Sequence, residues 1–162
     1  MCKQDCSAMP SLADVCADEA EMLAVSVSRF IAAAHMTSDA ACWDAAYNCV
    51  ETILGADEGP LFVAGIAGLM RALRFERDAP WHFLPAPCCR LTRDEETLVE
   101  LLAMARHQQG REVERVAARL AGSGTAPRLV AAAHRGAIAI DRAARCLGAP
   151  HDRFAPATAA LH

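Results

Sequence analysis

Residues 79–95 read Ala-Pro-Trp-His-Phe-Leu-Pro-Ala-Pro-Cys-Cys-Arg-Leu-Thr-Arg-Asp-Glu and separate two halves of the chain. Pro80, Pro85 and Pro87 forbid a helix in the first part of this stretch, because proline lacks the backbone N–H and disfavours helical geometry in the residue before it. Thr92 and Glu95 then form a capping box, with Thr at the N-cap and Glu three positions later. We therefore expect an irregular segment that ends abruptly in a new helix.

Working outward, apolar residues recur every three or four positions on both sides, which is the spacing of one helix face. Before the segment, this pattern predicts helices at about Leu12–Ala34, from Ser38 to Gly55 and from Gly59 into the charged turn at 74–78. After it, the pattern predicts three more, the last ending near Leu147. Much of the 54% hydrophobic content is alanine, the best helix former. The sequence predicts an all-α, single-domain bundle of about six helices with a Pro-rich irregular segment in the middle.

Three polar residues mark expected helix starts. Ser11 precedes the first helix, Ser38 the second and Thr125 the last, and each can accept a hydrogen bond from an unpaired N–H of the first turn. The domain spans residues 1–162, with residues 1–10 and 149–162 expected to be flexible tails.

Charge and hydropathy restrict the partners and the location. The formal net charge is −4 and no basic run occurs, so we expect no nucleic-acid partner. No uncharged apolar stretch reaches the roughly 18–20 residues that span a bilayer, and the N-terminus lacks a signal-peptide pattern. We therefore expect no membrane association and a cytoplasmic location with mostly reduced cysteines. Lys3 is the only lysine, and this preference for arginine, with abundant Ala, Gly and Pro, indicates a GC-rich bacterial genome.

The Pro-rich segment also holds the candidate metal ligands. Cys88, Cys89 and His82 carry thiol and imidazole groups, which are good ligands for zinc, copper or iron. Cys2 and Cys6 could join the two thiols in a four-sulfur site, although nothing in the sequence brings them together. The alternative is that the cysteines are small buried hydrophobes, as free cysteines commonly are. No cofactor is required by the sequence, and a transition metal is the candidate.

The same segment is the predicted binding site. Trp81 and Arg90 are of the types that anchor protein interfaces, and an arginine next to thiols makes them more reactive. A connection this long and apolar is expected to lie across the helices and close one end of the core. The predicted binding residues are Trp81, His82, Cys88, Cys89 and Arg90. In the alternative, Trp81 and its neighbours only plug the bundle.

Small residues on two predicted helices suggest self-association. Gly65 and Gly68 lie on the third helix, and Gly136 lies with several alanines on the last. Such faces allow close backbone approach and suit a homodimer. The alternative is that the two faces pack against each other within one chain.

Catalytic and phosphate-binding motifs are missing from the sequence. It has no His-Glu-x-x-His, Gly-x-Ser-x-Gly, Gly-rich phosphate-loop or Rossmann pattern. We therefore predict a non-enzymatic regulatory, adaptor or accessory protein that self-associates and has a protein partner. A metal- or redox-responsive protein and a small-molecule-binding protein are the alternatives.

Overall fold

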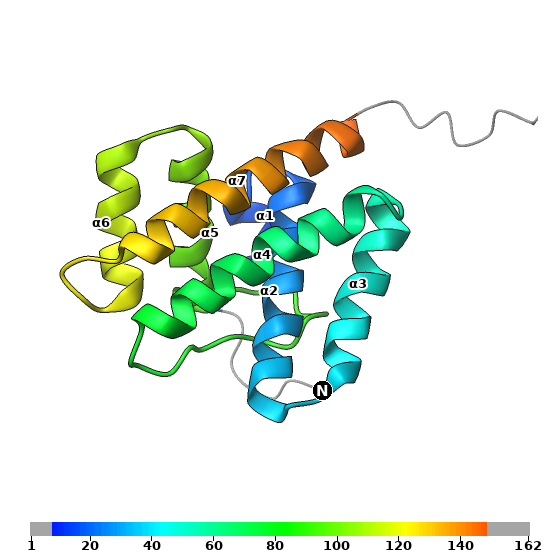
Figure 1. Ribbon diagram of the computed structural model, residues 1–162, viewed down its shortest axis with the longest axis horizontal. Coiled ribbons are helices and arrows are strands. Elements are labelled where there is room, and N and C mark those ends of the chain that lie inside the picture. The colour runs from blue at the N-terminus through cyan, green and yellow to red at the C-terminus, as the bar shows by residue number, and fades with distance from the viewer. Residues whose placement is uncertain (1–7, 149–162) are drawn as a thin grey trace, which may run out of the picture.

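The computed structural model describes residues 8–148, which form seven helices (Figure 1). Their bounds are α1 (Leu12–Val15), α2 (Glu19–Thr37), α3 (Ala40–Leu54), α4 (Glu58–Glu76), α5 (Arg93–Arg106), α6 (Gly110–Ala121) and α7 (Pro127–Gly148). The described residues contain no strand beyond one isolated bridge, between Ser11 and Arg90. The predicted all-α fold is confirmed, since α1 and α2 occupy the place of the first expected helix and α3–α7 are the other five.

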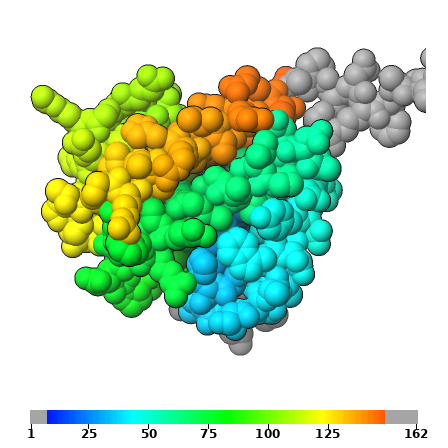
Figure 2. Space-filling model, viewed as in Figure 1, coloured from blue at the N-terminus to red at the C-terminus, as the bar shows by residue number. Residues whose placement is uncertain are grey.

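Helices α4 and α7 form the centre of the molecule and run antiparallel, side by side, across the face shown in Figures 1 and 2. Helices α2 and α3 pack against α4, and α5 and α6 pack against α7. The main buried cluster contains residues from both sides of the Pro-rich segment, for example Ile31, Leu69, Leu101 and Ile140. The two halves of the chain therefore share one core.

The contact between α4 and α7 depends on small residues. A Cβ placed on Gly65 of α4 would lie 2.8 Å from the Cβ of Ala139 of α7. One placed on Gly136 of α7 would lie 3.3 Å from Leu102, which belongs to α5. Both glycines thus allow close helix packing inside one chain, which is the alternative considered for these small-residue faces. Gly68 has open space around it, and the homodimer stays a prediction.

The first predicted helix is interrupted, which corrects the expectation of one helix over Leu12–Ala34. The chain breaks between α1 and α2, where the Asp18 side chain accepts a hydrogen bond from Glu21 N at 2.9 Å. The Glu21 side chain in turn accepts one from Ala17 N at 2.8 Å. Asp18 as the N-cap and Glu21 three positions later therefore start a new helix here, although the apolar pattern predicted one continuous helix.

Two other expected caps are wrong. Asp39, and not Ser38, caps α3, while Ser38 ends α2 in the left-handed conformation at φ 57°. At the start of α7 the acceptor is Glu76 from the end of α4, whose carboxylate takes the N–H groups of Arg128 at 2.9 Å and Leu129 at 2.8 Å. A cap supplied by another helix leaves no local sequence signal.

One stretch is long and apolar enough to cross a membrane by composition alone, Ala40–Glu76, with a mean hydropathy of 1.4 in its most apolar part. In the structure this stretch is two helices, α3 and α4, which turn back on each other at Gly55. Glycine suits the turn because its φ there is +87°.

Of the two predicted tails, residues 1–7 and 149–162 lie outside the described part of the chain. The remaining tail residues, 8–10, lie against the Pro-rich segment. Pro10 accepts a hydrogen bond from Leu91 N at 3.0 Å, and Met9 accepts one from Arg90 Nη1 at 3.0 Å. This start of the described chain therefore supports the segment.

Candidate functional site

A buried ion pair anchors the Pro-rich segment, residues 79–91, to the helices. Arg29 of α2 and Glu95 of α5 are 1% and 0% exposed, and their side chains meet at 2.7 and 3.0 Å in a two-point contact. Glu95 also accepts the N–H groups of Leu84 at 3.2 Å and Thr92 at 2.8 Å, the second being its half of the predicted capping box. One carboxylate thus caps α5, neutralises Arg29 and holds the segment.

The guanidinium of Arg29 uses its remaining N–H groups on the segment's backbone. It donates to the carbonyls of Cys88 and Arg90, each at 2.5 Å, and to that of Pro85 at 3.4 Å. Proline has no backbone N–H and supplies no donor for the carbonyl groups of such a segment. Those carbonyl groups need N–H donors from other parts of the chain. Arg29 gives that support and fixes the shape of the segment.

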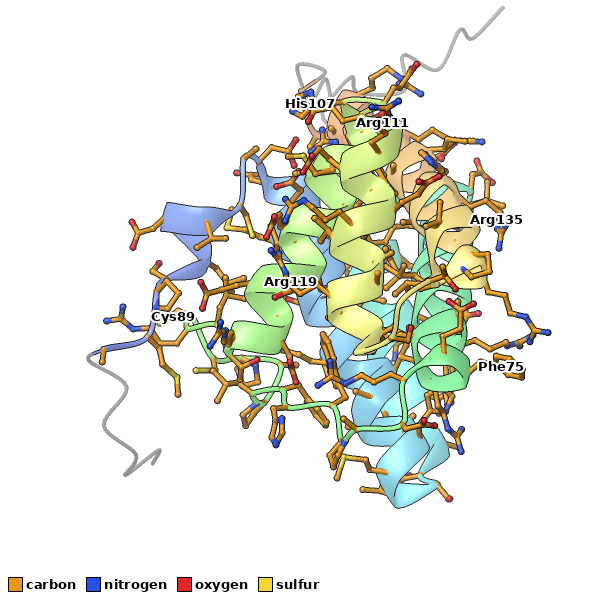
Figure 3. The ribbon with its side chains drawn as sticks, turned by 90° about the vertical axis from the view of Figure 1, so that its left-hand side faces the viewer. Phe75, Cys89, His107, Arg111, Arg119 and Arg135 are labelled. Carbon is orange, nitrogen blue, oxygen red and sulfur yellow. The ribbon has the colours of Figure 1, made fainter. Side chains whose placement is uncertain are left out.

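The thiol end of the segment faces away from the helical core. Cys88 is half-buried and Cys89 is exposed, and both are free thiols. Figure 3 shows Cys89 at the edge of the molecule, on the side opposite Phe75 and Arg135. Within residues 8–148, no three His, Cys, Asp or Glu side chains lie together as a metal site would require. Cys2 and Cys6 lie outside the described residues.

The other predicted site residues separate from one another. The His82 ring is 74% exposed, and its Nδ1 lies 3.2 Å from Asp94 Oδ2, which also accepts the His82 backbone N–H at 3.0 Å. Arg90 reaches the N-terminal segment, as described above. Only Trp81 turns toward the helices, so the five predicted residues do not form one site.

Trp81 lines a cavity of 310 Å³ between α2, α4 and the start of the segment. Its walls are mostly apolar. The lining residues are Ala32, His35, Met36, Met70, Leu73, Arg74, Arg77, Ala79, Pro80, Trp81 and Phe83. The apolar side chains of the segment therefore do close one end of the bundle, as expected, but they leave a space.

Two polar groups of this cavity differ in their pairing. Arg77 lies 5.9 Å from the centre of the Trp81 ring, and its guanidinium is occupied by Asp94 at 3.0 Å and the Leu120 carbonyl at 2.5 Å. The indole Nε1 of Trp81 is buried and has no acceptor among the described residues. A buried donor without a partner costs about 1–3 kcal/mol, so the cavity wall is destabilised at this point.

The mouth of the cavity is cationic. Arg74 is exposed and has no acidic partner within residues 8–148, and the same holds for Arg71 one turn earlier. The pKa of His35 is lowered, first by partial burial and then by the charges of Arg74 and Arg71. The His35 ring also meets the Trp43 ring edge-on at 5.8 Å between centroids. His35 is therefore mainly neutral at pH 7, and the two arginines set a positive potential at the opening.

Sequence reasoning found Trp81 but missed His35, Met36, Met70 and Arg74. These residues come from the end of α2 and the second half of α4, which meet only in the folded chain. The available signal was Met36, a large apolar residue at the very end of a helix, which is 74% exposed beside the cavity.

Known proteins give no guide to this site, because no family model, curated protein or solved structure matches the chain.

Proposed function

We propose that this chain is a non-enzymatic, cytoplasmic regulatory or accessory protein of bacterial origin that binds a small amphipathic anion in the cavity beside Trp81. The observation that carries the proposal is the pairing of apolar walls with Arg74, a cation without an acidic partner in the described chain. A suitable ligand has an aromatic or branched aliphatic body and one carboxylate, sulfonate or phosphate group.

The size and the chemistry of the cavity support this ligand class. At 310 Å³ the cavity is at the lower end of the usual range for small-molecule sites, roughly 300–1,000 Å³. Met36, Met70 and Trp81 provide polarizable surface that adapts to different apolar shapes. The guanidinium of arginine can form two parallel hydrogen bonds to the oxygens of such an anion, so Arg74 would orient the charged end toward solvent and the apolar end inward.

The proposal is tested with a matched pair of fluorescent probes. 1-Anilinonaphthalene-8-sulfonate has an apolar aromatic body with one sulfonate, and N-phenyl-1-naphthylamine is the same body without it. We expect saturable binding of the sulfonate at one site per chain, followed by energy transfer from tryptophan, and weaker binding of the neutral probe. Arg74→Gln should weaken the sulfonate and leave the neutral probe unchanged, because only the sulfonate uses the charge.

Filling the cavity provides the second arm. Ala32 lines the cavity, whereas Ala33, the next residue on α2, does not. Ala32→Met should weaken both probes by about tenfold or more, which corresponds to roughly 1.4 kcal/mol, while Ala33→Met should bind them normally. Met36→Ala changes a cavity-lining residue that is 74% exposed, so the melting temperature should stay unchanged. Equal binding of the probes by Ala32→Met and Ala33→Met would contradict the proposal. Equal affinity of the unmodified protein for the two probes would contradict it as well.

A further inference from the structure

The outer face of α4 and α7 has a one-sided charge distribution. Every acidic side chain of these two helices is engaged. Glu58 pairs with Arg142 at 2.6 Å, Glu76 caps α7 and Asp141 pairs with Arg106 at 2.8 Å. Glu58 also lies near Arg145, whose charge contributes to lowering the pKa of the Glu58 carboxyl.

Several arginines on the same helices have no acidic partner in the described chain. They are Arg71 and Arg74 on α4, and Arg128 and Arg135 on α7. On α7 the exposed positions 128, 131, 135, 138, 142 and 145 alternate steps of three and four, which places them on one face of the helix. The row reads Arg, Ala, Arg, Ile, Arg, Arg.

Large apolar side chains are exposed on the same face. Leu61 and Phe75 of α4 are 52% and 66% exposed, and Ile138 of α7 is 63% exposed. The guanidinium of Arg128 lies 3.7 Å from the centre of the Phe75 ring. Figure 3 shows Phe75 and Arg135 projecting from the same side of the molecule, and Figure 2 shows that side from the front. The cations and the exposed apolar groups therefore share one surface.

This surface is hollowed between the two helices. A groove of 210 Å³ lies there, lined by Leu61 and Ile138 and reaching the close contact between Gly65 and Ala139. Arg135, Arg142 and Glu58 also line it. Glu58 neutralises Arg142, so the unpaired charge at the edge of the groove is that of Arg135. A groove with apolar sides and a cationic edge accepts apolar side chains projecting from a helix that carries carboxylates beside them.

The same features argue against two other occupants. A second copy placed by a twofold axis would bring one row of arginines against the same row of its partner, and like charges in contact are unfavourable. A bilayer surface is continuous and would leave the groove unfilled. We propose that the outer face of α4 and α7 is a docking surface for an acidic amphipathic helix of another protein, with an apolar side chain seated between Leu61 and Ile138.

The proposal is tested on the full chain with a fluorescein-labelled acidic peptide of about 20 residues, long enough to be helical in water. The peptide has Leu at every third or fourth position and Glu on either side of that stripe. We expect saturable binding by fluorescence anisotropy that weakens as salt rises. A peptide with Lys in place of every Glu should not bind.

Charge reversal on the protein locates the surface. Arg135→Glu should weaken the acidic peptide by about tenfold or more. Arg111→Glu makes the same change in net charge at an exposed arginine of α6, which Figure 3 shows away from Arg135, and should stay within roughly twofold of wild type. Ile138→Ala, at an exposed position, should weaken binding without changing the melting temperature.

The outcomes are distinct. No saturable binding of the acidic peptide, or an equal loss in Arg135→Glu and Arg111→Glu, overturns the proposal. Arg135-dependent binding to phosphatidylglycerol vesicles or duplex DNA, with none to the peptide, overturns it in favour of a membrane or nucleic-acid surface. Ala32→Met, which tests the cavity, should leave peptide binding unchanged, so the two proposals succeed or fail separately.

Discussion

Arg29 is the single residue on which the shape of the Pro-rich segment most depends. Arg29→Ala leaves the carboxylate of Glu95 and three carbonyl groups buried without their donor, and we expect the free energy of unfolding to fall by about 3–5 kcal/mol. Urea unfolding followed by circular dichroism measures the loss. Arg119→Ala removes an exposed ion pair with Glu100 and should cost no more than about 1 kcal/mol. Equal losses in the two variants would show that the buried pair contributes no more to the free energy of unfolding than an exposed one.

The thiols differ in reactivity because of their surroundings. The pKa of Cys16 is raised to about 12, first because burial disfavours the thiolate and then because the carboxylates of Glu21 and Asp18 lie nearby, against the opposing charge of Arg29. Cys89 is exposed. Iodoacetamide at pH 8 should therefore label Cys89 early and Cys16 only on unfolding, as peptide mass mapping can show. Early labelling of Cys16 in the folded protein would contradict the assignment.

The same shift makes stability depend on pH. The unfolded chain loses the Cys16 proton near its ordinary pKa of 9.0, while the folded chain keeps it to about 12. Above pH 9 the folded state therefore binds more protons, and stability falls as pH rises. Cys16→Ala should flatten the decline in melting temperature between about pH 8.5 and 10.5. An unchanged slope would remove Cys16 as its cause.

At the scale of the element, two glycines one turn apart on α4 should respond in opposite ways. Gly65→Ala places a methyl group 2.8 Å from the Cβ of Ala139, so α4 and α7 must separate, and overpacking of this kind costs about 1–3 kcal/mol. Gly68 has open space at the same position, so Gly68→Ala should stabilise the helix by up to about 1 kcal/mol. Thermal unfolding compares them. Adding Ala139→Gly to Gly65→Ala should restore stability, and a stabilising Gly65→Ala would disprove the close contact.

The cap of α7 differs between the sequence, which predicts Thr125, and the structure, in which Glu76 accepts the N–H groups. Glu76→Ala removes the acceptor for two N–H groups of α7 and should cost about 0.5–2 kcal/mol, the usual range for a lost cap. Thr125→Ala should be nearly neutral, because Thr125 is exposed and its side chain has no cap bond in the structure. Denaturant midpoints measure both. A larger loss in Thr125→Ala than in Glu76→Ala would support Thr125 as the cap, as the sequence predicts, and contradict the role of Glu76.

The helices were predictable where the signal is local. The capping box at Thr92 and Glu95 and the turn at Gly55 follow from neighbouring residues alone, and both are observed. The break before α2 was also predictable, since Asp18 and Glu21 have the spacing of a helix cap. It was missed because the apolar pattern of one helix face continues from Leu12 to Ala34 across the break. Glu76 could not be identified as the cap of α7, because 52 residues separate it from Arg128.

At the scale of the whole molecule, the two proposed binding surfaces form only after the helices pack. Trp81 was predictable as a site residue from its place among prolines, but its cavity partners Met36 and Arg74 belong to helices that the sequence does not bring together. The cationic face was missed for a related reason. Arg128 and Arg135 are seven residues apart in the sequence, so no basic run marks them. In the folded chain both lie on one face of α7, because residues seven apart are about two helical turns apart.

The buried pair of Arg29 and Glu95 also imposes an order on biosynthesis. The two residues are 66 positions apart, so at translation rates of 5–20 residues per second Arg29 leaves the ribosome roughly 3–13 s before its counter-ion. During that interval the guanidinium has no buried partner and stays hydrated, which keeps the adjoining face of α2 from docking. The N-terminal half of the chain therefore completes this buried contact only after α5 emerges.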